Sequence, residues 1–176
     1  MKFYVARHGE TAWNKENRIC GRTELPLNAR GHEQAELLAG KLANVPIDRI
    51  IASPMLRARQ TAAAVSEKLG IPVQTDPRLI EQDYGIYEGL DRNNPGFLNN
   101  KRQFASRYPG GESMMDVAYR VYALIEELKQ KYPKENVLLV CHGGVCRVAR
   151  TYFEDMTNEE FYGYSPENGV VSEYML

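Results

Sequence analysis

The sequence contains few cysteines and few histidines, three of each. The cysteines are odd in number and form no C-x-x-C pair: Cys20, Cys141 and Cys146. The histidines lack the close spacing of metal ligands: His8, His32 and His142. A disulfide framework needs paired cysteines, and a zinc site needs clustered ligands. The sequence therefore supports neither, and we expect no metal and no other cofactor.

The chain also lacks long apolar runs and an excess of charge of either sign. No stretch approaches the ~20 apolar residues that cross a bilayer, and the N-terminus does not resemble a signal peptide. The 22 basic and 23 acidic side chains give a net charge of −1, which is not the electrostatic footprint of a nucleic-acid-binding protein. We expect a cytoplasmic protein with neither a nucleic acid nor a membrane as partner.

The sequence has the length and patterning of one α/β domain. Its 176 residues suit a single domain, 1–176, with a sizeable core. Apolar runs alternate with amphipathic stretches, which is typical of a three-layer sandwich with helices on both sides of a mainly parallel central sheet. The predicted strands are 2–6, 49–52, 72–74, 137–141 and an edge strand within 170–176. Three helices are predicted: one begins after Asn28, the second runs from an N-cap at Ser53 to Gly70, and the third runs from Glu112–Ser113 to Pro133.

One segment, 90–111, is irregular in composition. It is rich in asparagine, proline and glycine, and it contains no acidic residue from 92 onward. Four basic residues lie in it: Arg92, Lys101, Arg102 and Arg107. A connection this long in a compact domain is often a functional flap or carries a short helix. We expect it to cover an anionic substrate, although solvated loop charge would explain the same pattern.

Basic and titratable residues follow the predicted strands. Arg7-His8-Gly9 ends the first strand, and His142-Gly143-Gly144 follows the late one. Arg57 lies about one turn inside the helix that follows the second strand, and Glu81 precedes a glycine turn. Ligands of α/β sheets bind at the carboxyl ends of the strands, and an arginine near a helix N-terminus suits a phosphate. The sequence therefore predicts a phosphate site at this edge.

These segments together resemble the histidine phosphatase superfamily, the phosphoglycerate mutase-like proteins, and in particular its compact phosphatases. The resemblance rests on RHGET after the first strand, SPMLRARQT at a helix start, a glutamate before GIYEG, and HGG after a late strand. It extends through CGRTELPL and GHEQA, and so covers nearly the whole chain. One departure is Glu24, where relatives more often carry aspartate; it concerns loop structure rather than chemistry.

The resemblance implies a role for each matching residue. His8 would attack phosphorus as a neutral nucleophile, and Arg7, Arg57 and a protonated His142 would surround the phosphoryl oxygens. Glu81 would protonate the leaving oxygen and then activate water, in preference to two competing acids, Glu10 and Glu88. Four smaller residues are also expected to contact the substrate: Asn14, Cys20, Gly21 and Gly143. Asn14 could instead cap a helix or a turn.

The expected activity is hydrolysis of the phosphate monoester of a small metabolite through a phosphohistidine. Three alternatives remain open at this point. The chain could be a cofactor-dependent phosphoglycerate mutase, although only 20 residues separate Gly89 from Gly110, which leaves little chain to exclude water from the site. Cys141 begins a C-x-x-G-x-x-R pattern typical of cysteine-dependent phosphatases, and a non-catalytic phosphate-binding module is the third possibility. The sequence does not identify the substrate, although we expect residues 18–24 and 90–113 to determine specificity. It also leaves the oligomeric state open, and a homodimer is one possibility.

Overall fold

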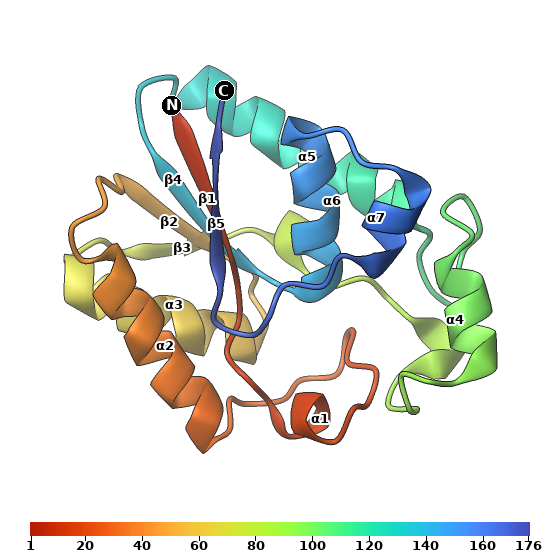
Figure 1. Cartoon of the computed structure of the whole chain (residues 1–176). Helices are drawn as coiled ribbons and strands as arrows, with labels where there is room; N and C mark the ends of the chain where they lie inside the picture. Colours follow the sequence, from red (N-terminus) through yellow and green to blue (C-terminus); the bar gives the residue numbers. More distant parts are fainter.

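The computed structural model describes all residues of the chain, 1–176, as five strands around which the helices pack (Figure 1). The strand order is β3-β2-β4-β1-β5, with β5 antiparallel to β1 and the other pairs parallel. The strands are β1 (Lys2–Arg7), β2 (Arg49–Ala52), β3 (Val73–Thr75), β4 (Val137–Cys141) and β5 (Val171–Met175). The helices are α1 (Ala12–Lys15), α2 (Ala29–Leu42), α3 (Leu56–Leu69), α4 (Pro95–Lys101), α5 (Met114–Lys131), α6 (Gly143–Phe153) and α7 (Asn158–Gly163), with 3-10 turns η1 (Pro77–Leu79) and η2 (Gly85–Tyr87).

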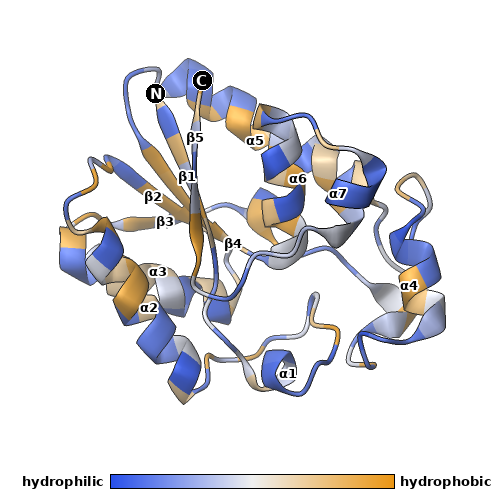
Figure 2. Ribbon diagram, in the orientation of Figure 1, coloured by the Kyte–Doolittle hydropathy of each residue, from blue (hydrophilic) through white to orange (hydrophobic).

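The sheet is the middle layer of three, as predicted. Because side chains alternate along a strand, Phe3 and Val5 pack on the side of α5 and α6, whereas Tyr4 and Ala6 pack on the side of α2 and α3. Figure 2 shows the apolar residues concentrated in the strands and on inward helix faces. No helix is long and apolar enough to span a membrane.

Most of the predicted helix ends are confirmed, and one is wrong. Asn28 and Ser113 cap α2 and α5 by accepting a hydrogen bond from the third helical residue, and Gly70 ends α3 with a φ of 68°. Ser53 is not the N-cap of α3, because the helix begins two residues later than expected, with Met55 at the cap. The hydroxyl of Ser53 is used in the candidate site instead.

The segment 90–111 is folded rather than irregular. It contains α4, and Phe97 of this helix packs in a small aromatic cluster with Ile19, Tyr84 and Tyr108. Tyr84 and Phe97 meet edge to face with ring centroids 5.6 Å apart. Because the cluster is separate from the two sheet cores, it fixes α4 beside the carboxyl ends of the strands, where Figure 1 shows this helix at one side of the molecule.

Strand register brings the candidate residues together. Arg7 of β1 pairs with Cys141 of β4, and both strands point the same way. The residues that follow, His8 and His142, therefore leave the sheet side by side. Ser53 follows β2, which pairs with β4 one residue earlier, and so reaches the same edge.

Candidate active site

His8 is buried, and its hydrogen bonds define its tautomer. Nδ1 lies 2.7 Å from the carbonyl oxygen of Gly9, which can only accept, and Nε2 lies 3.3 Å from Nε of Arg57, which can only donate. Nδ1 therefore carries the proton and Nε2 carries the lone pair. Burial, followed by the charges of Arg57 and Arg7, holds the pKa of His8 well below 6.5, so the ring is neutral at pH 7.

Gly9 is required by the close packing of the loop against α2. A Cβ at this position would lie 2.3 Å from the carbonyl oxygen of Gly31 on α2, and the backbone of Gly9 is not left-handed. Its N–H donates to Oγ1 of Thr61 on α3 at 3.0 Å. The loop that carries His8 is thus fixed between two helices.

Arg57 is completely buried and points toward His8. Its Nη1 donates to the carbonyl oxygen of Thr23 at 2.9 Å, and its Nη2 donates to that of Gly21 at 2.7 Å. These two bonds orient the guanidinium with Nε toward the imidazole. Gly21 therefore acts on the site through Arg57 and is not among the residues that line the cavity, and its contact with substrate stays a prediction.

His142 lies next to His8 but is not charged in the free protein. The ring centroids are 5.1 Å apart, inclined at 61°. Burial, then the Arg57 charge and His8, hold the pKa of His142 well below 6.5, so the ring is neutral in the unliganded protein. The protonated ring is expected in the substrate complex, and it stays a prediction. Nε2 of His142 is 2.8 Å from Oγ of Ser53, and its buried Nδ1 has no partner, which leaves one ring nitrogen available to a ligand.

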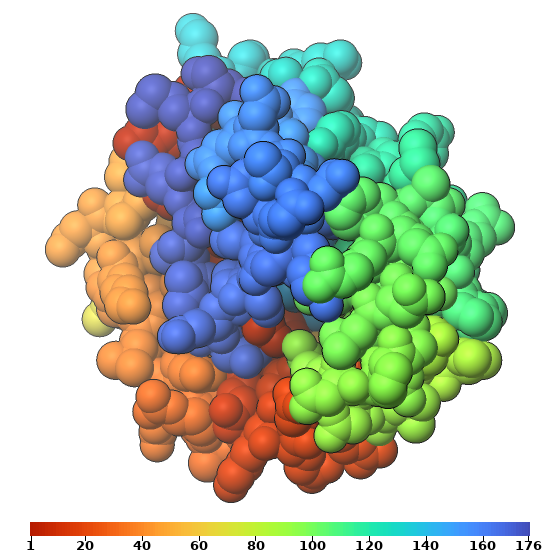
Figure 3. All heavy atoms as spheres, turned by 45° about the vertical axis from the view of Figure 1, so that its right-hand side comes forward, coloured from red at the N-terminus to blue at the C-terminus, as the bar shows by residue number.

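A cavity of about 30 Å³ opens above His8. Its wall combines predicted and unpredicted residues: Arg7, His8, Asn14, Cys20, Glu81, Tyr84, Arg92, Gly143, Gly144, Arg147 and Ser165. Figure 3 shows the hollow where the N-terminal, central and C-terminal segments, drawn red, green and blue, meet. Arg57 and His142 do not line it; they adjoin His8.

Glu81 is the acid at this cavity, and the two competing acids have other roles. Both carboxylate oxygens of Glu81 accept backbone N–H groups, Oε1 from Gln82 at 2.8 Å and Oε2 from Gly144 at 3.1 Å. Glu10 accepts a hydrogen bond from the Asn28 amide, and Glu88 holds the backbone of the 18–24 loop. Position therefore favours Glu81 as the group that exchanges a proton with a bound ester.

The smaller predicted residues divide between structural and site positions. Asn14 completes the capping box of α1 through Oδ1, which accepts from the backbone and hydroxyl of Thr11, and Asn14 also lines the cavity. Cys20 and Gly143 line the cavity, and Gly143 packs against the Arg7 guanidinium. Nε of Arg7 is buried without a partner, while Nη1 donates to Pro166.

Two further cations line the cavity; Arg92 was expected as part of the segment that covers the substrate, whereas Arg147 was not predicted for this site. Arg147, on α6, and Arg92, before α4, line it beside Arg7. The signal for Arg147 is its place four residues after Gly143, which puts both on one face of α6. Arg102 and Arg107, expected to cover a substrate, lie elsewhere: Arg102 stacks on Tyr162 at 3.9 Å, and exposed Arg107 pairs with Asp116.

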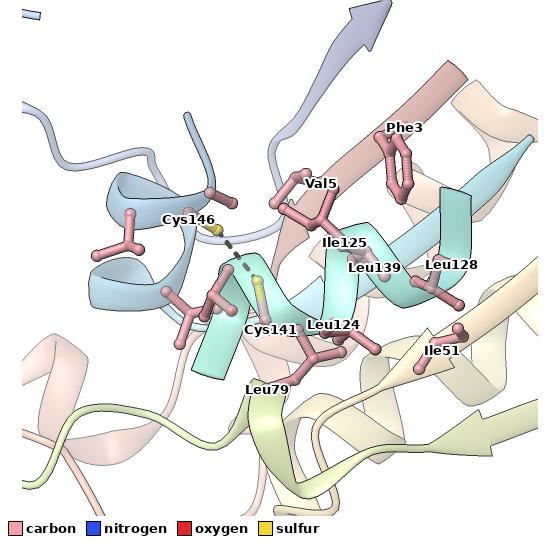
Figure 4. Packing of buried hydrophobic residues seen from close by; sticks show 14 of the residues in the cluster. Phe3, Val5, Ile51, Leu79, Leu124, Ile125, Leu128, Leu139, Cys141 and Cys146 are labelled. Atoms are coloured by element: carbon pink, nitrogen blue, oxygen red, sulfur yellow. Dashed lines mark hydrogen bonds between the residues drawn. The ribbon is translucent and has the colours of Figure 1, made fainter. Parts of the chain in front are cut away.

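The structure argues against a cysteine nucleophile. Cys141 is fully buried in the core between β4 and α5, and its Sγ lies 3.5 Å from that of Cys146 (Figure 4). Burial raises the pKa of the Cys141 thiol well above its usual range, which keeps it protonated and unreactive. No three His, Cys, Asp or Glu side chains gather as metal ligands anywhere in the chain. Metal independence stays a prediction for experiment.

Comparisons with known proteins agree with this geometry. The family model of the histidine phosphatase superfamily (branch 1) matches residues 3–175. The uncharacterized phosphatase PhoE of Bacillus subtilis is 33% identical over 84% of this chain and 74% of its own length, and a probable phosphoglycerate mutase GpmB of Enterobacter is 36% identical over 81% and 70%. The mycobacterial glucosyl-3-phosphoglycerate phosphatase, solved with VO3, superposes with a TM-score of 0.89 at 28% identity, covering 98% of this chain and 90% of that one. The chain belongs to the histidine phosphatase superfamily.

Proposed function

We propose that the chain hydrolyses phosphate monoesters through a covalent bond between phosphorus and Nε2 of His8. The observation that carries the proposal is the fixed tautomer of a neutral, buried imidazole at the floor of a cation-lined cavity. A nitrogen lone pair is the nucleophile that such a step requires. The Gly9 carbonyl keeps the other ring nitrogen protonated throughout.

In the first step, Nε2 of His8 attacks phosphorus while the bond from phosphorus to the ester oxygen breaks. Glu81 gives its proton to that leaving oxygen, and the alcohol departs. Arg7 and Arg147 face the cavity and neutralise charge on the phosphoryl oxygens. Arg57, which occupies the lone pair of Nε2 in the free protein, turns its Nε–H to a phosphoryl oxygen when substrate binds.

In the second step, Glu81 takes a proton from a water molecule as the water oxygen attacks phosphorus. The bond to Nε2 breaks, inorganic phosphate forms, and His8 and Glu81 return to their starting protonation states. His142 contributes through Nδ1, the buried nitrogen without a partner. A phosphate dianion beside it favours the protonated ring, so we expect His142 to take up a proton as substrate binds.

A screen of phosphate monoesters, with His8→Ala and Cys141→Ser as paired variants, tests the proposal. We expect His8→Ala to abolish turnover and the acid-quenched phosphoenzyme, and Cys141→Ser to keep most of both, because Cys141 is a core residue. Full activity of His8→Ala would refute the mechanism.

The mutase named among the relatives is the second candidate, and decay of the phosphoenzyme separates it from the phosphatase. In rapid-quench measurements without an acceptor, we expect loss to inorganic phosphate at the rate of kcat. A phosphoenzyme that persists until a phosphoglycerate is added would establish the mutase instead.

A further inference from the structure

The helix α5 carries a second apolar stripe on its outer face. Its inner face packs in the core through a first stripe of buried residues: Val117, Val121, Leu124, Ile125 and Leu128. The outer face repeats the helical spacing with four further apolar residues: Met115, Tyr119, Tyr122 and Ala123. Met115 is 62% exposed and Tyr119 is 82% exposed, which makes Tyr119 the most exposed large apolar side chain of the chain. A helix that covers a sheet ordinarily turns polar residues to solvent, so the outer stripe indicates a surface that is covered in an assembly.

Two hollows meet along this stripe. A groove of about 250 Å³ lies between α5, α6 and α7, and seven of its nine wall residues are apolar, among them Met115, Ala118, Met156 and Phe161. A second hollow, of about 430 Å³, lies along the outer face of α5 from Met115 to Glu126. Met115 and Ala118 line both, so the hollows form one continuous apolar surface, called the α5 surface below. It shares no wall residue with the cavity above His8.

Charged residues border the α5 surface, and their signs differ between its two ends. At the N-terminal end of α5, Arg107 pairs with Asp116, and the arginine side chain is the more exposed of the two, at 71%. At the other end, Glu126 pairs with Lys129, and here the carboxylate side chain is the more exposed, at 51%. An apolar centre rich in methionine and tyrosine with a charged rim is typical of a protein–protein interface.

This arrangement makes the α5 surface complementary to a second copy of itself. A two-fold axis perpendicular to α5 brings two copies of the helix together antiparallel. When Tyr119 packs on Met115 of the second copy, each copy covers the residue that both hollows of the other share. In the same register, Glu126 lies seven residues, or about 10 Å, further along and so reaches the N-terminal end of the second α5. That is the end at which Arg107 is exposed.

The size of the α5 surface sets the expected strength of the contact. The groove is lined by nine residues and the second hollow by six, two of which are shared, whereas each side of a standard interface contributes roughly 20–30 residues. Tyr119 makes up a large part of the area, because burial of a tyrosine removes on the order of 200 Å² from water. The contact is therefore at the small, reversible end of specific interfaces.

We propose that the α5 surface is the interface of a homodimer in which two copies of α5 pack antiparallel about a two-fold axis. The inference is independent of the proposed function, because the surface lies apart from the cavity above His8. Dimerisation through α5 leaves that cavity uncovered in both copies.

Sedimentation velocity of the full chain between about 2 and 200 µM tests the interface. We expect a monomer–dimer equilibrium with a Kd on the order of 10 µM. Tyr119→Ser should raise the Kd at least about tenfold, and so should Met156→Lys, which places a charge in the groove. Leu37→Ser is the matched control, since Leu37 is a 59% exposed apolar side chain on α2, outside the α5 surface, and it should leave the Kd unchanged. Circular dichroism and thermal unfolding confirm that each variant is folded.

Charge reversal tests the antiparallel orientation. Arg107→Glu or Glu126→Arg alone should raise the Kd at least about threefold, because each places like charges opposite each other between the copies. The double variant restores opposite charges and should recover most of the wild-type affinity. A double variant as weak as the single ones would overturn the antiparallel pairing. A wild-type chain that stays monomeric at 200 µM, or a Kd that either Tyr119→Ser or Met156→Lys leaves unchanged, would overturn the interface.

Discussion

The two buried histidines of the site predict how the stability of the fold depends on pH. Burial is the largest cause that holds the pKa of both below 6.5, and the Arg57 charge is the next. In the unfolded chain both rings titrate near the ordinary value of about 6.5. Below that pH the unfolded state binds two protons that the folded state does not bind, so a lower pH favours unfolding.

The sign and size follow from this difference. A histidine with a depressed pKa contributes no pH dependence well above 6.5, and stability falls as the pH drops from 6.5 toward the folded pKa. Each ring lowers the free energy of unfolding by about 1.4 kcal/mol per pH unit in that window. For as long as both rings stay neutral, the two together remove about 3 kcal/mol per pH unit below 6.5. Carboxylates with lowered pKa values, such as Asp116 at about 2, take effect only at lower pH.

Urea unfolding at intervals between pH 7.5 and 5.0 measures the slope. We expect His142→Asn to halve it, and His32→Asn, an exposed position on α2, to leave it unchanged. Ring NMR signals give an independent reading if the first variant is too unstable for urea titration. A slope that is the same in the wild-type protein and in His142→Asn would show that the ring titrates normally in the folded state, and the neutral-histidine argument would fail.

Three further predictions concern the reaction. Glu81→Gln should lower kcat about 100-fold or more for alkyl phosphates and much less for p-nitrophenyl phosphate, whose leaving group needs no proton; equal losses would remove Glu81 as the acid. Gly144→Ala should lower kcat at least about tenfold, because the new Cβ would lie 2.6 Å from Oε1 of Glu81. Gly163→Ala is the control, since there is open space around Gly163, and it should have no effect. Full activity of Gly144→Ala would mean that the Glu81 carboxylate is not held in place. EDTA should leave kcat/KM unchanged, and activity lost in EDTA and restored by a divalent ion would contradict metal independence.

The layered fold could be predicted from the sequence because its signals are local. Alternation of apolar runs identified the strands, and residues with a specific backbone preference, such as Asn28 and Gly70, marked helix ends. Ser53 misled this reasoning because serine before proline favours a cap, whereas here its hydroxyl lies 2.8 Å from Nε2 of His142. A contact with a residue 89 positions away leaves no trace in local sequence.

The candidate site could be predicted where residues follow strands, and less well elsewhere. His8, His142 and Glu81 lie where the ends of the strands and the glycine turns indicate, but the charge state of His142 depends on burial and on Arg57, neither of which spacing reveals. Gly21 was expected to touch substrate, and the structure adds that its carbonyl oxygen orients Arg57. Such indirect roles require the three-dimensional contacts.

The charged segment 90–111 shows why composition alone misplaces a binding surface. Its four cations look equivalent in sequence, yet only Arg92 and Lys101 line a cavity, because the aromatic cluster around Phe97 sets which side of α4 faces the site. Of the other two, Arg107 pairs with Asp116, and Arg102 stacks closely on the ring of Tyr162, which Lys101 also approaches, at 4.5 Å. A positive charge marks an anion site only when folding leaves it without a partner, and Arg147, buried on α6 with two unpartnered nitrogens, meets that condition although it lies outside the segment. Substrate choice in this chain is therefore expected to depend on which cations the core has left unpaired, rather than on how many the loop contains.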